Sequence, residues 1–219
     1  MHVLSWNLFH GRAVPPSGRP LLGDFARALA GWDWDVALLQ EVPPWWPPQL
    51  ARAAGATAAR TALTSRNTGL AARRAVAVRA PDLIKSNGGG ANAILVRDGP
   101  VLEHRRQTLR WWPERRVAHG VRLASGVWCV NLHAQVHSEA RAAADIARAA
   151  RAALAWSSGG PVVLGGDFNV PAPKAAGFVA AGGRGVDHVL AHELQGVGDA
   201  RRLDSGRLSD HRPVLVHVG

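Results

Sequence analysis

Acidic, amide and imidazole side chains follow several short apolar stretches of this sequence. The apolar residues 162–164 predict a buried strand, and Gly165 and Gly166 predict a turn after it. Asp167 and Asn169 then stand where the strand ends, the place where ligand crevices open in α/β sheets. Taken alone, this cluster also fits a turn capped by Asx residues. Polar groups of the same kind lie at the ends of other predicted strands: Asn7, Glu41, Asn131 with His133, Asp187 with His188, and Asp210 with His211.

Together, these residues predict one kind of chemistry. Carboxylate and amide oxygens without cysteine partners suit a hard dication, Mg²⁺ or Mn²⁺, better than structural zinc. The histidines add groups that change charge near neutral pH. A hard dication beside acid–base groups is what phosphodiester hydrolysis requires, because charge builds on the phosphoryl oxygens while a water molecule must be activated.

The hydrophobic pattern predicts a layered α/β fold that could position these residues. We expect helices over 21–30, 49–54 and 138–156 and near 175–180, and loops over 15–20, 43–48 and 86–90. Strands are expected over 3–8, 36–39, 75–78, 93–97, 101–109, 116–123, 126–132, 162–164, 186–190 and 213–218. The strands between 101 and 132 have tight glycine turns and predict an antiparallel meander. No linker divides the chain, so we expect residues 1–219 to form one domain.

Composition limits the partners and the compartment. The formal net charge of +10 and the sequence pI near 11.5 favour a polyanionic partner, nucleic acid first and an anionic membrane surface second. As the nucleic-acid partner we expect DNA ahead of RNA. Nearly all the basic residues are arginine, however, so genomic compositional bias is an alternative explanation. The single cysteine, Cys129, and the lack of a signal-peptide pattern predict a cytoplasmic protein. We expect the protein to be a monomer. We also expect no stable membrane insertion, because no apolar stretch approaches the length of a bilayer span.

A series of motifs in this chain resembles the endonuclease/exonuclease/phosphatase superfamily, typified by deoxyribonuclease I and exonuclease III. They occur in the family's order and span nearly the whole chain: Leu4-Ser5-Trp6-Asn7, Leu38-Leu39-Gln40-Glu41, Asn92-Ala93-Ile94-Leu95, Asn131-Leu132-His133, Gly166-Asp167-Phe168-Asn169, Val186-Asp187-His188 and Ser209-Asp210-His211-Arg212-Pro213. The resemblance implies a four-layer α/β sandwich, with two mixed β-sheets packed face to face and helices outside.

The resemblance also implies a metal site beside an activated water molecule. Glu41 would be the principal metal ligand, with Asn7 and Asp210 close to the metal. Asp167 would orient or activate the attacking water, and Asn169 would hold the phosphate or the nucleophile.

Two histidines would take part in catalysis. His211 would contact the scissile phosphate as a general acid/base and would be oriented by Asp187 through a ring N–H. His133 occupies the place of the second catalytic histidine of the deoxyribonuclease I branch. That histidine pairs with a carboxylate there, and this chain has no evident counterpart, since no glutamate lies between Glu41 and Glu103.

The predicted phosphate contacts are Arg116, or its neighbour Arg115, and Asn131. Trp111 and Trp112 would either stack on bases or belong to the core or rim of the fold. Tyrosine is absent, whereas the abasic-site endonucleases of this superfamily use a tyrosine near the phosphate, so the resemblance does not favour that branch.

The predicted function is therefore a metal-dependent phosphodiesterase that acts on nucleic acid. One alternative keeps the chemistry and changes the substrate to a phospholipid head group or a small phosphate ester. Membrane use would need an exposed apolar patch, for which residues 43–47, with Trp45 and Trp46, are the candidate. Another alternative is an inactive relative that only binds nucleic acid or protein, although the retained ligand series argues against it.

Overall fold

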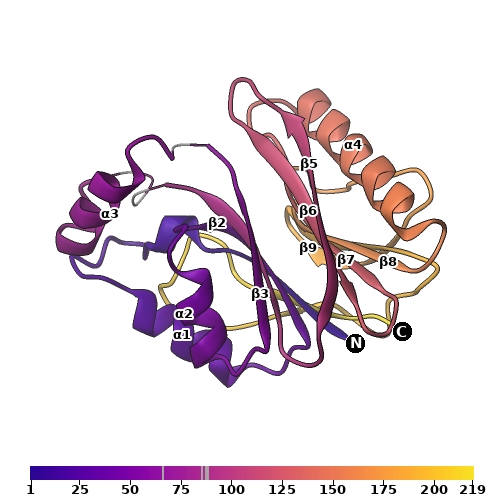
Figure 1. The fold of residues 1–219 in the computed structure, drawn as a ribbon, viewed down its shortest axis with the longest axis horizontal. Helices are drawn as coiled ribbons and strands as arrows, with labels where there is room; N and C mark the ends of the chain where they lie inside the picture. Colours follow the sequence, from indigo (N-terminus) through magenta and orange to yellow (C-terminus); the bar gives the residue numbers. More distant parts are fainter. Residues whose placement is uncertain (66, 85, 87–88) are drawn as a thin grey trace.

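Two six-stranded β-sheets form the framework of the computed structural model, which describes residues 1–65, 67–84, 86 and 89–219 (Figure 1). The first sheet has the order β11-β12-β1-β2-β4-β3 and comprises β1 (His2–Asn7), β2 (Val36–Val42), β3 (Ala58–Leu63), β4 (Ala91–Val96), β11 (Arg201–Arg202) and β12 (Val214–His217). The second has the order β5-β6-β7-β8-β10-β9 and comprises β5 (Val101–Arg110), β6 (Arg116–Leu123), β7 (Trp128–His133), β8 (Val162–Asp167), β9 (Val179–Arg184) and β10 (Asp187–His192). Each sheet is mixed, with one central parallel pair, β1–β2 or β7–β8.

Helices cover the outer faces of the two sheets, so the molecule is the expected four-layer sandwich (Figure 1). Helices α1 (Leu22–Gly31) and α2 (Pro47–Ala53) pack on the first sheet, and α4 (Glu139–Ser157) packs on the second. Alternation along β1 shows how the sequence builds these layers: Val3 lies in the core between the sheets, whereas Leu4 and Trp6 lie in the core beneath α1. A short 3₁₀ helix, η1 (Phe9–Gly11), follows β1 directly.

The topology brings the predicted site residues to one edge of the sandwich. The central strands β1, β2, β7 and β8 end at this edge, and the register pairs Asn7 with Gln40 and His133 with Asp167. The antiparallel strand β10 begins there, with Asp187 opposite Asp167. Parallel strands place their carboxyl ends together, and this is why residues far apart in the chain meet.

Glycines 165 and 166 do not form the expected turn, because both lie inside β8. They are needed for close approach between elements. A Cβ at Gly165 would lie 2.7 Å from Leu38 Cδ1 of the facing sheet, and a Cβ at Gly166 would collide with the carbonyl oxygen of Leu132 on β7. The absence of these side chains lets β8 sit deep in the sandwich and carry Asp167 to the site.

Two other predictions of local structure were wrong, and one strand was missed. Residues 75–78 belong to α3 (Leu70–Arg79), an Ala- and Arg-rich helix in which only Ala77 is buried among the described residues. The expected helix near 175–180 is a turn at Gly177, with φ of +81°, followed by β9. The edge strand β3 was missed because its sequence lacks a strong apolar alternation. The predicted meander is confirmed as β5-β6-β7, and the predicted loop over 86–90 lies partly outside the described residues.

Candidate active site

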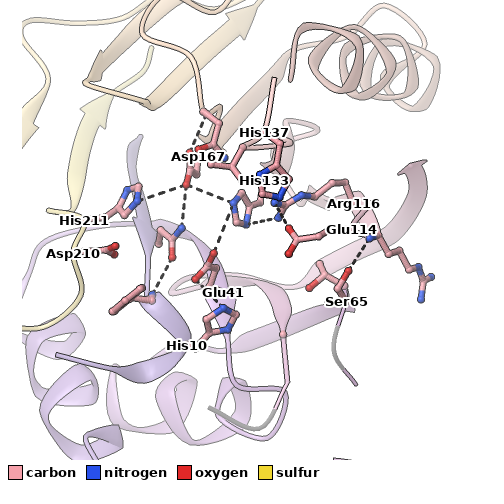
Figure 2. Close-up of a pocket in the computed structure, with 17 residues that line it drawn as sticks. His10, Glu41, Ser65, Glu114, Arg116, His133, His137, Asp167, Asp210 and His211 are labelled. Atoms are coloured by element: carbon pink, nitrogen blue, oxygen red, sulfur yellow. Dashed lines mark hydrogen bonds and ion pairs between the residues drawn. The ribbon is translucent and has the colours of Figure 1, made fainter. Parts of the chain in front are cut away.

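A pocket of about 370 Å³ opens where the central strands end (Figure 2). Eight of the ten predicted site residues line it: Asn7, Glu41, Arg116, His133, Asp167, Asn169, Asp210 and His211. Asp187 lies behind this lining and contacts His211, whereas Asn131 does not reach the pocket.

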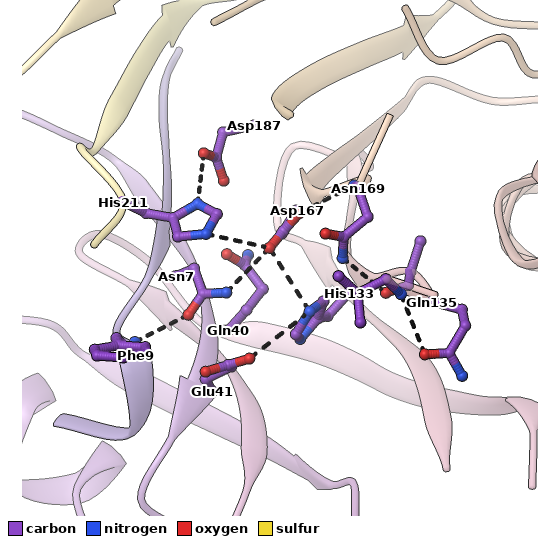
Figure 3. Close-up of polar contacts among 12 residues, drawn as sticks. Asn7, Phe9, Gln40, Glu41, His133, Gln135, Asp167, Asn169, Asp187 and His211 are labelled. Carbon is purple, nitrogen blue, oxygen red and sulfur yellow. Dashed lines mark hydrogen bonds and ion pairs between the residues drawn. The ribbon is translucent and has the colours of Figure 1, made fainter. Parts of the chain in front are cut away.

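Asp167 is the centre of the site and is only 1% exposed. Its Oδ2 atom accepts a hydrogen bond from Asn7 Nδ2 at 3.0 Å, and its Oδ1 atom accepts one from the backbone N–H of Asn169 at 3.0 Å. The Nε2 atoms of His133 and His211 lie 3.6 Å and 3.8 Å from Oδ2 (Figure 3). Burial raises the pKa of Asp167, against the lowering effect of the His211 charge. The carboxyl group is therefore held in place while being a stronger base than an exposed aspartate.

His211 and Asp187 form the predicted pair. The Nδ1 atom of His211 lies 2.9 Å from Asp187 Oδ2, which leaves Nε2 directed at Asp167. Burial, the largest single effect, lowers the pKa of His211, but the hydrogen bond and charge of Asp187 and the charges of Asp167 and Asp210 outweigh it and raise the pKa to about 9. His211 is therefore an imidazolium at neutral pH.

His133 has a different partner from the expected carboxylate. Its Nδ1 atom lies 3.0 Å from Arg116 Nη1, and Arg116 Nη2 donates to Glu114 Oε2 at 2.7 Å. An arginine can only donate, so Nδ1 of His133 accepts and the ring proton is on Nε2. Burial and then the Arg116 charge lower the pKa of His133 well below its usual value. The two histidines thus differ in charge, and both direct an Nε2–H toward Asp167.

We expect His133→Gln to retain activity better than His133→Ala. The glutamine amide can place an N–H near the position of Nε2, whereas alanine removes the donor and also removes the acceptor of Arg116 Nη1. The expected loss of kcat is about 10²-fold for His133→Ala and about tenfold or less for His133→Gln. Steady-state kinetics on one substrate of the wild-type protein would measure both. Equal losses would contradict a role for His133 as a neutral hydrogen-bond donor.

Glu41 is placed in the pocket by an irregularity of β2. The ladder with β4 shifts between Leu39 and Val42, and Glu41 has a φ of +51°. Its Oε2 atom lies 3.1 Å from His10 Nε2, and its Oε1 atom lies 3.9 Å from His133 Nε2. Burial, followed by the negative charge of Asp167, raises the pKa of Glu41 to about 7.

The donor set of the pocket fits a hard divalent cation. The carboxylates of Glu41, Asp167 and Asp210 face one pocket, and their mutual repulsion contributes to the raised pKa of Glu41. A cation there would relieve this repulsion. Glu41 and Asp210 offer carboxylate oxygens, and the amide oxygen of Asn7 accepts a bond from Phe9 N at 2.9 Å while retaining a second lone pair. Among the described residues, the ligand atoms of Asp167, Asp187 and His211 also lie within 4.8 Å of one another, but His211 and Asp187 are already bonded to each other.

The structure corrects the prediction for Asn131 and modifies that for Arg116. Asn131 is fully buried between the sheets, where its Nδ2 donates to the carbonyl oxygens of Leu39 at 2.8 Å and Ala93 at 2.9 Å. It ties the two sheets together and does not face a phosphate. Arg116 lines the pocket, but it is 6% exposed and engaged with His133 and Glu114, so the more accessible Arg115 is the better placed of the two for a phosphate.

Sequence reasoning missed several residues that line the pocket, among them Ser65, His137, His10 and Glu114. His10 reaches Glu41 because η1 turns the chain back immediately after β1, and His10 itself has a φ of +54°. No motif marks it. Glu114 stands two residues before Arg116, and this spacing next to a predicted phosphate-binding arginine was the available signal.

Comparison with solved structures gives the same architecture. A functionally unknown conserved protein from Enterococcus faecalis V583 superposes with a TM-score of 0.73 at 16% identity, covering 100% of this chain and 99% of that one. A mannosyl-6-phosphatase from Bacteroides thetaiotaomicron VPI-5482 has a TM-score of 0.69 at 14% identity, covering 100% and 99%. Truncated TDP2 from Caenorhabditis elegans has a TM-score of 0.64 at 17% identity, covering 98% and 96%. At sequence identities of 14% to 17%, the structural similarity establishes the fold of this chain.

Sequence comparison extends the likeness to the family. No curated protein is similar enough in sequence to match this chain. The model of the Endonuclease/Exonuclease/phosphatase family, whose members hydrolyse phosphoester bonds, matches residues 4–211. This match includes every residue of the pocket from Asn7 to His211. By sequence as well as by fold, the chain belongs to the Endonuclease/Exonuclease/phosphatase family.

Proposed function

We propose that this protein is a divalent-metal-dependent phosphodiesterase that cleaves nucleic acid, DNA in preference to RNA, as a monomer. The observation that carries the chemistry is the setting of Asp167, a buried carboxylate between a cationic and a neutral imidazole in a pocket rich in carboxylates. The net charge of +10 supports a polyanionic substrate, because an excess of arginine attracts phosphate backbones.

The side chains around Asp167 supply the proton transfers of hydrolysis. Asn7 and the backbone N–H of Asn169 hold the carboxylate so that it can accept a proton from an attacking water. As the water oxygen bonds to phosphorus and the P–O bond to the leaving group breaks, the His211 imidazolium gives its Nε2 proton to the leaving oxygen. Asp167 can then return its proton to His211, 3.8 Å away, which restores both groups.

Glu41 and Asp210, with Asn7, would hold the Mg²⁺ or Mn²⁺ ion. When bound, the ion offsets the negative charge of the phosphoryl oxygens and polarises the phosphate. The neutral His133 donates its Nε2–H into the same region, and its orientation is maintained by Arg116.

A small phosphate ester is the second candidate substrate. The mannosyl-6-phosphatase relative has 99% of its length covered by this chain, so the compact fold alone does not favour a polymer. The phospholipid alternative loses its main support, since Trp46 is 4% exposed and packs in the α1–α2 core, and Trp45 is half-buried. No helix among the described residues combines the length and apolarity needed to cross a bilayer.

Cleavage of supercoiled plasmid tests the proposal against the second candidate. Wild-type protein would be assayed with Mg²⁺, Mn²⁺ or EDTA at two salt concentrations, beside mannose 6-phosphate and a bis-aryl phosphodiester. We expect metal-dependent nicking that decreases at higher salt and is lost in Asp167→Asn. Release of phosphate from the sugar ester with an intact plasmid would instead establish a small-molecule phosphatase. DNA binding without turnover of any substrate would indicate an inactive relative.

A further inference from the structure

Trp111 and Trp112 are exposed in a protein that buries its other tryptophans. All nine tryptophans lie among the described residues, and the remaining seven are buried or half-buried. The residues Trp111 and Trp112 are 71% and 79% exposed. Leaving two large aromatic surfaces in water forfeits the stabilisation that burial provides, so a ligand that covers them would recover it.

The pair lies in the chain just before the pocket-lining residues Glu114 and Arg115, on a well-anchored base. It follows the last residue of β5, Arg110, which pairs in register with Arg116, the first residue of β6. Arg110 Nε donates to Oδ1 of the fully buried Asp145 at 3.1 Å, and this contact fixes the end of β5 to α4. The short connection between β5 and β6 therefore begins at the Arg110–Asp145 ion pair and ends at Arg116, the arginine that contacts His133.

Arg115 links the aromatic pair to the pocket. Its guanidinium lies 4.8 Å from the centre of the Trp111 ring, and the residue lines the pocket. Its backbone N–H donates to Ser65 Oγ at 2.7 Å, which ties this side of the pocket to the chain segment that follows β3 (Figure 2). An aromatic surface next to a cation at the edge of a phosphate-hydrolysing pocket suits a ligand that carries a flat ring beside a phosphate.

We propose that Trp111 and Trp112 form a stacking site for an unpaired nucleobase next to the cleaved phosphate, with Arg115 contacting the adjoining phosphate. The inference rests on the proposed nucleic-acid substrate and specifies it as single-stranded or locally unpaired. A base within a duplex is already stacked on both faces, so it cannot offer one to a protein ring without leaving the helix. The charge of +10 favours this occupant over an uncharged aromatic ligand.

Binding of intact and abasic oligonucleotides tests the site directly. Two 5′-labelled single strands of equal length, an oligo-dT and the same backbone with abasic residues in its central positions, would be titrated with protein in the presence of Mg²⁺. The Asp167→Asn background prevents cleavage, and anisotropy gives the affinity. We expect intact oligo-dT to bind about tenfold more tightly than the abasic strand. The double variant Trp111→Ala/Trp112→Ala should lose this preference, and its affinity for the abasic strand should equal that of the protein with both tryptophans.

Two further variants separate stacking from a general surface effect. Trp111→Phe/Trp112→Phe should recover much of the preference for the intact strand, because phenylalanine retains an aromatic face. Leu102→Ala removes an apolar side chain that is 50% exposed on β5, the strand that precedes the tryptophan pair, and should leave both affinities unchanged. Melting temperatures would confirm that these exposed substitutions leave the fold intact.

The outcomes distinguish this inference from the proposed function. The stacking site would be overturned if the protein with both tryptophans bound the intact and the abasic strands with equal affinity. It would also be overturned if the double alanine variant lost the same affinity for both strands. Either result would count even if plasmid cleavage is observed. Loss of affinity for mannose 6-phosphate in the alanine variant, with no change for either oligonucleotide, would assign the pair to sugar binding instead. Metal-dependent cleavage by the wild-type protein is tested separately, in the plasmid assay.

Discussion

Replacement of Asp167 by asparagine is expected to lower kcat by about 10³-fold or more on any phosphoester that the protein hydrolyses. Asparagine keeps the size of the side chain and can still accept the hydrogen bond from the Asn169 backbone, but it cannot take a proton from water. The measurement is single-turnover hydrolysis with saturating metal, which separates the chemical step from product release. Activity within tenfold of wild type would show that another group activates the water.

The same substitution is expected to leave the melting temperature, measured in EDTA, unchanged or higher. Burial raises the pKa of Asp167, so the folded state disfavours the ionised carboxylate that is present at neutral pH. A neutral amide removes that cost, although one hydrogen bond of the carboxylate is lost. Asp33→Asn is a suitable control, since its side chain is 88% exposed on the surface and its removal should affect neither property. A large fall in stability for Asp167→Asn would mean that its activity loss reflects unfolding.

Replacement of Asp187 by asparagine is expected to move the alkaline limit of activity to lower pH. The hydrogen bond and the charge of Asp187 are the two largest effects that raise the pKa of His211 to about 9, whereas the charges of Asp167 and Asp210 remain in the variant. A pKa lower by about one unit would reduce the protonated fraction of His211 at pH 8.5 roughly threefold and leave it nearly unchanged at pH 6. Activity should therefore fall by about threefold or more at pH 8.5, and by much less at pH 6.

A pH–rate profile of kcat from pH 5.5 to 10 would measure this shift. Asp204→Asn is the control, because it removes the same charge from an exposed loop, where the carboxylate accepts a local hydrogen bond from Gly206 N. A second readout is the melting temperature. Since the folded pKa of His211 exceeds its unfolded value, the stabilisation from its protonation is complete below about pH 6.5 and is lost as the pH rises through about 9. A profile parallel to wild type would contradict a catalytic imidazolium at position 211.

Much of the site was determined by the sequence itself. Asp167, Glu41 and His211 were identifiable because each lies at or near one end of a short apolar strand, and the polar end of a buried strand can lie only at a sheet edge. The order of the motifs then implied the sandwich. The long helix after β7 and the antiparallel β5-β6-β7 meander also followed from local periodicity and glycine turns.

Side-chain partnerships were decided only by the tertiary structure. The sequence offered no means of finding that Arg116, rather than a carboxylate, holds His133, because the two residues meet across neighbouring strands. Asn131 has the residue type of a phosphate ligand, and only its position between the sheets reveals that its amide joins two backbone carbonyls. His10 reaches Glu41 through the turn of η1, for which no local pattern exists.

The physical reason for this division is that periodicity records which face of an element is buried, whereas the partner of a polar group depends on which elements become neighbours. Gly166 shows the difference clearly. Its residue type predicted a turn, but its actual requirement is space beside the carbonyl oxygen of Leu132 on the adjacent strand. Such a requirement exists only after β7 and β8 have paired, so it can be recognised in the folded protein and not in either segment alone.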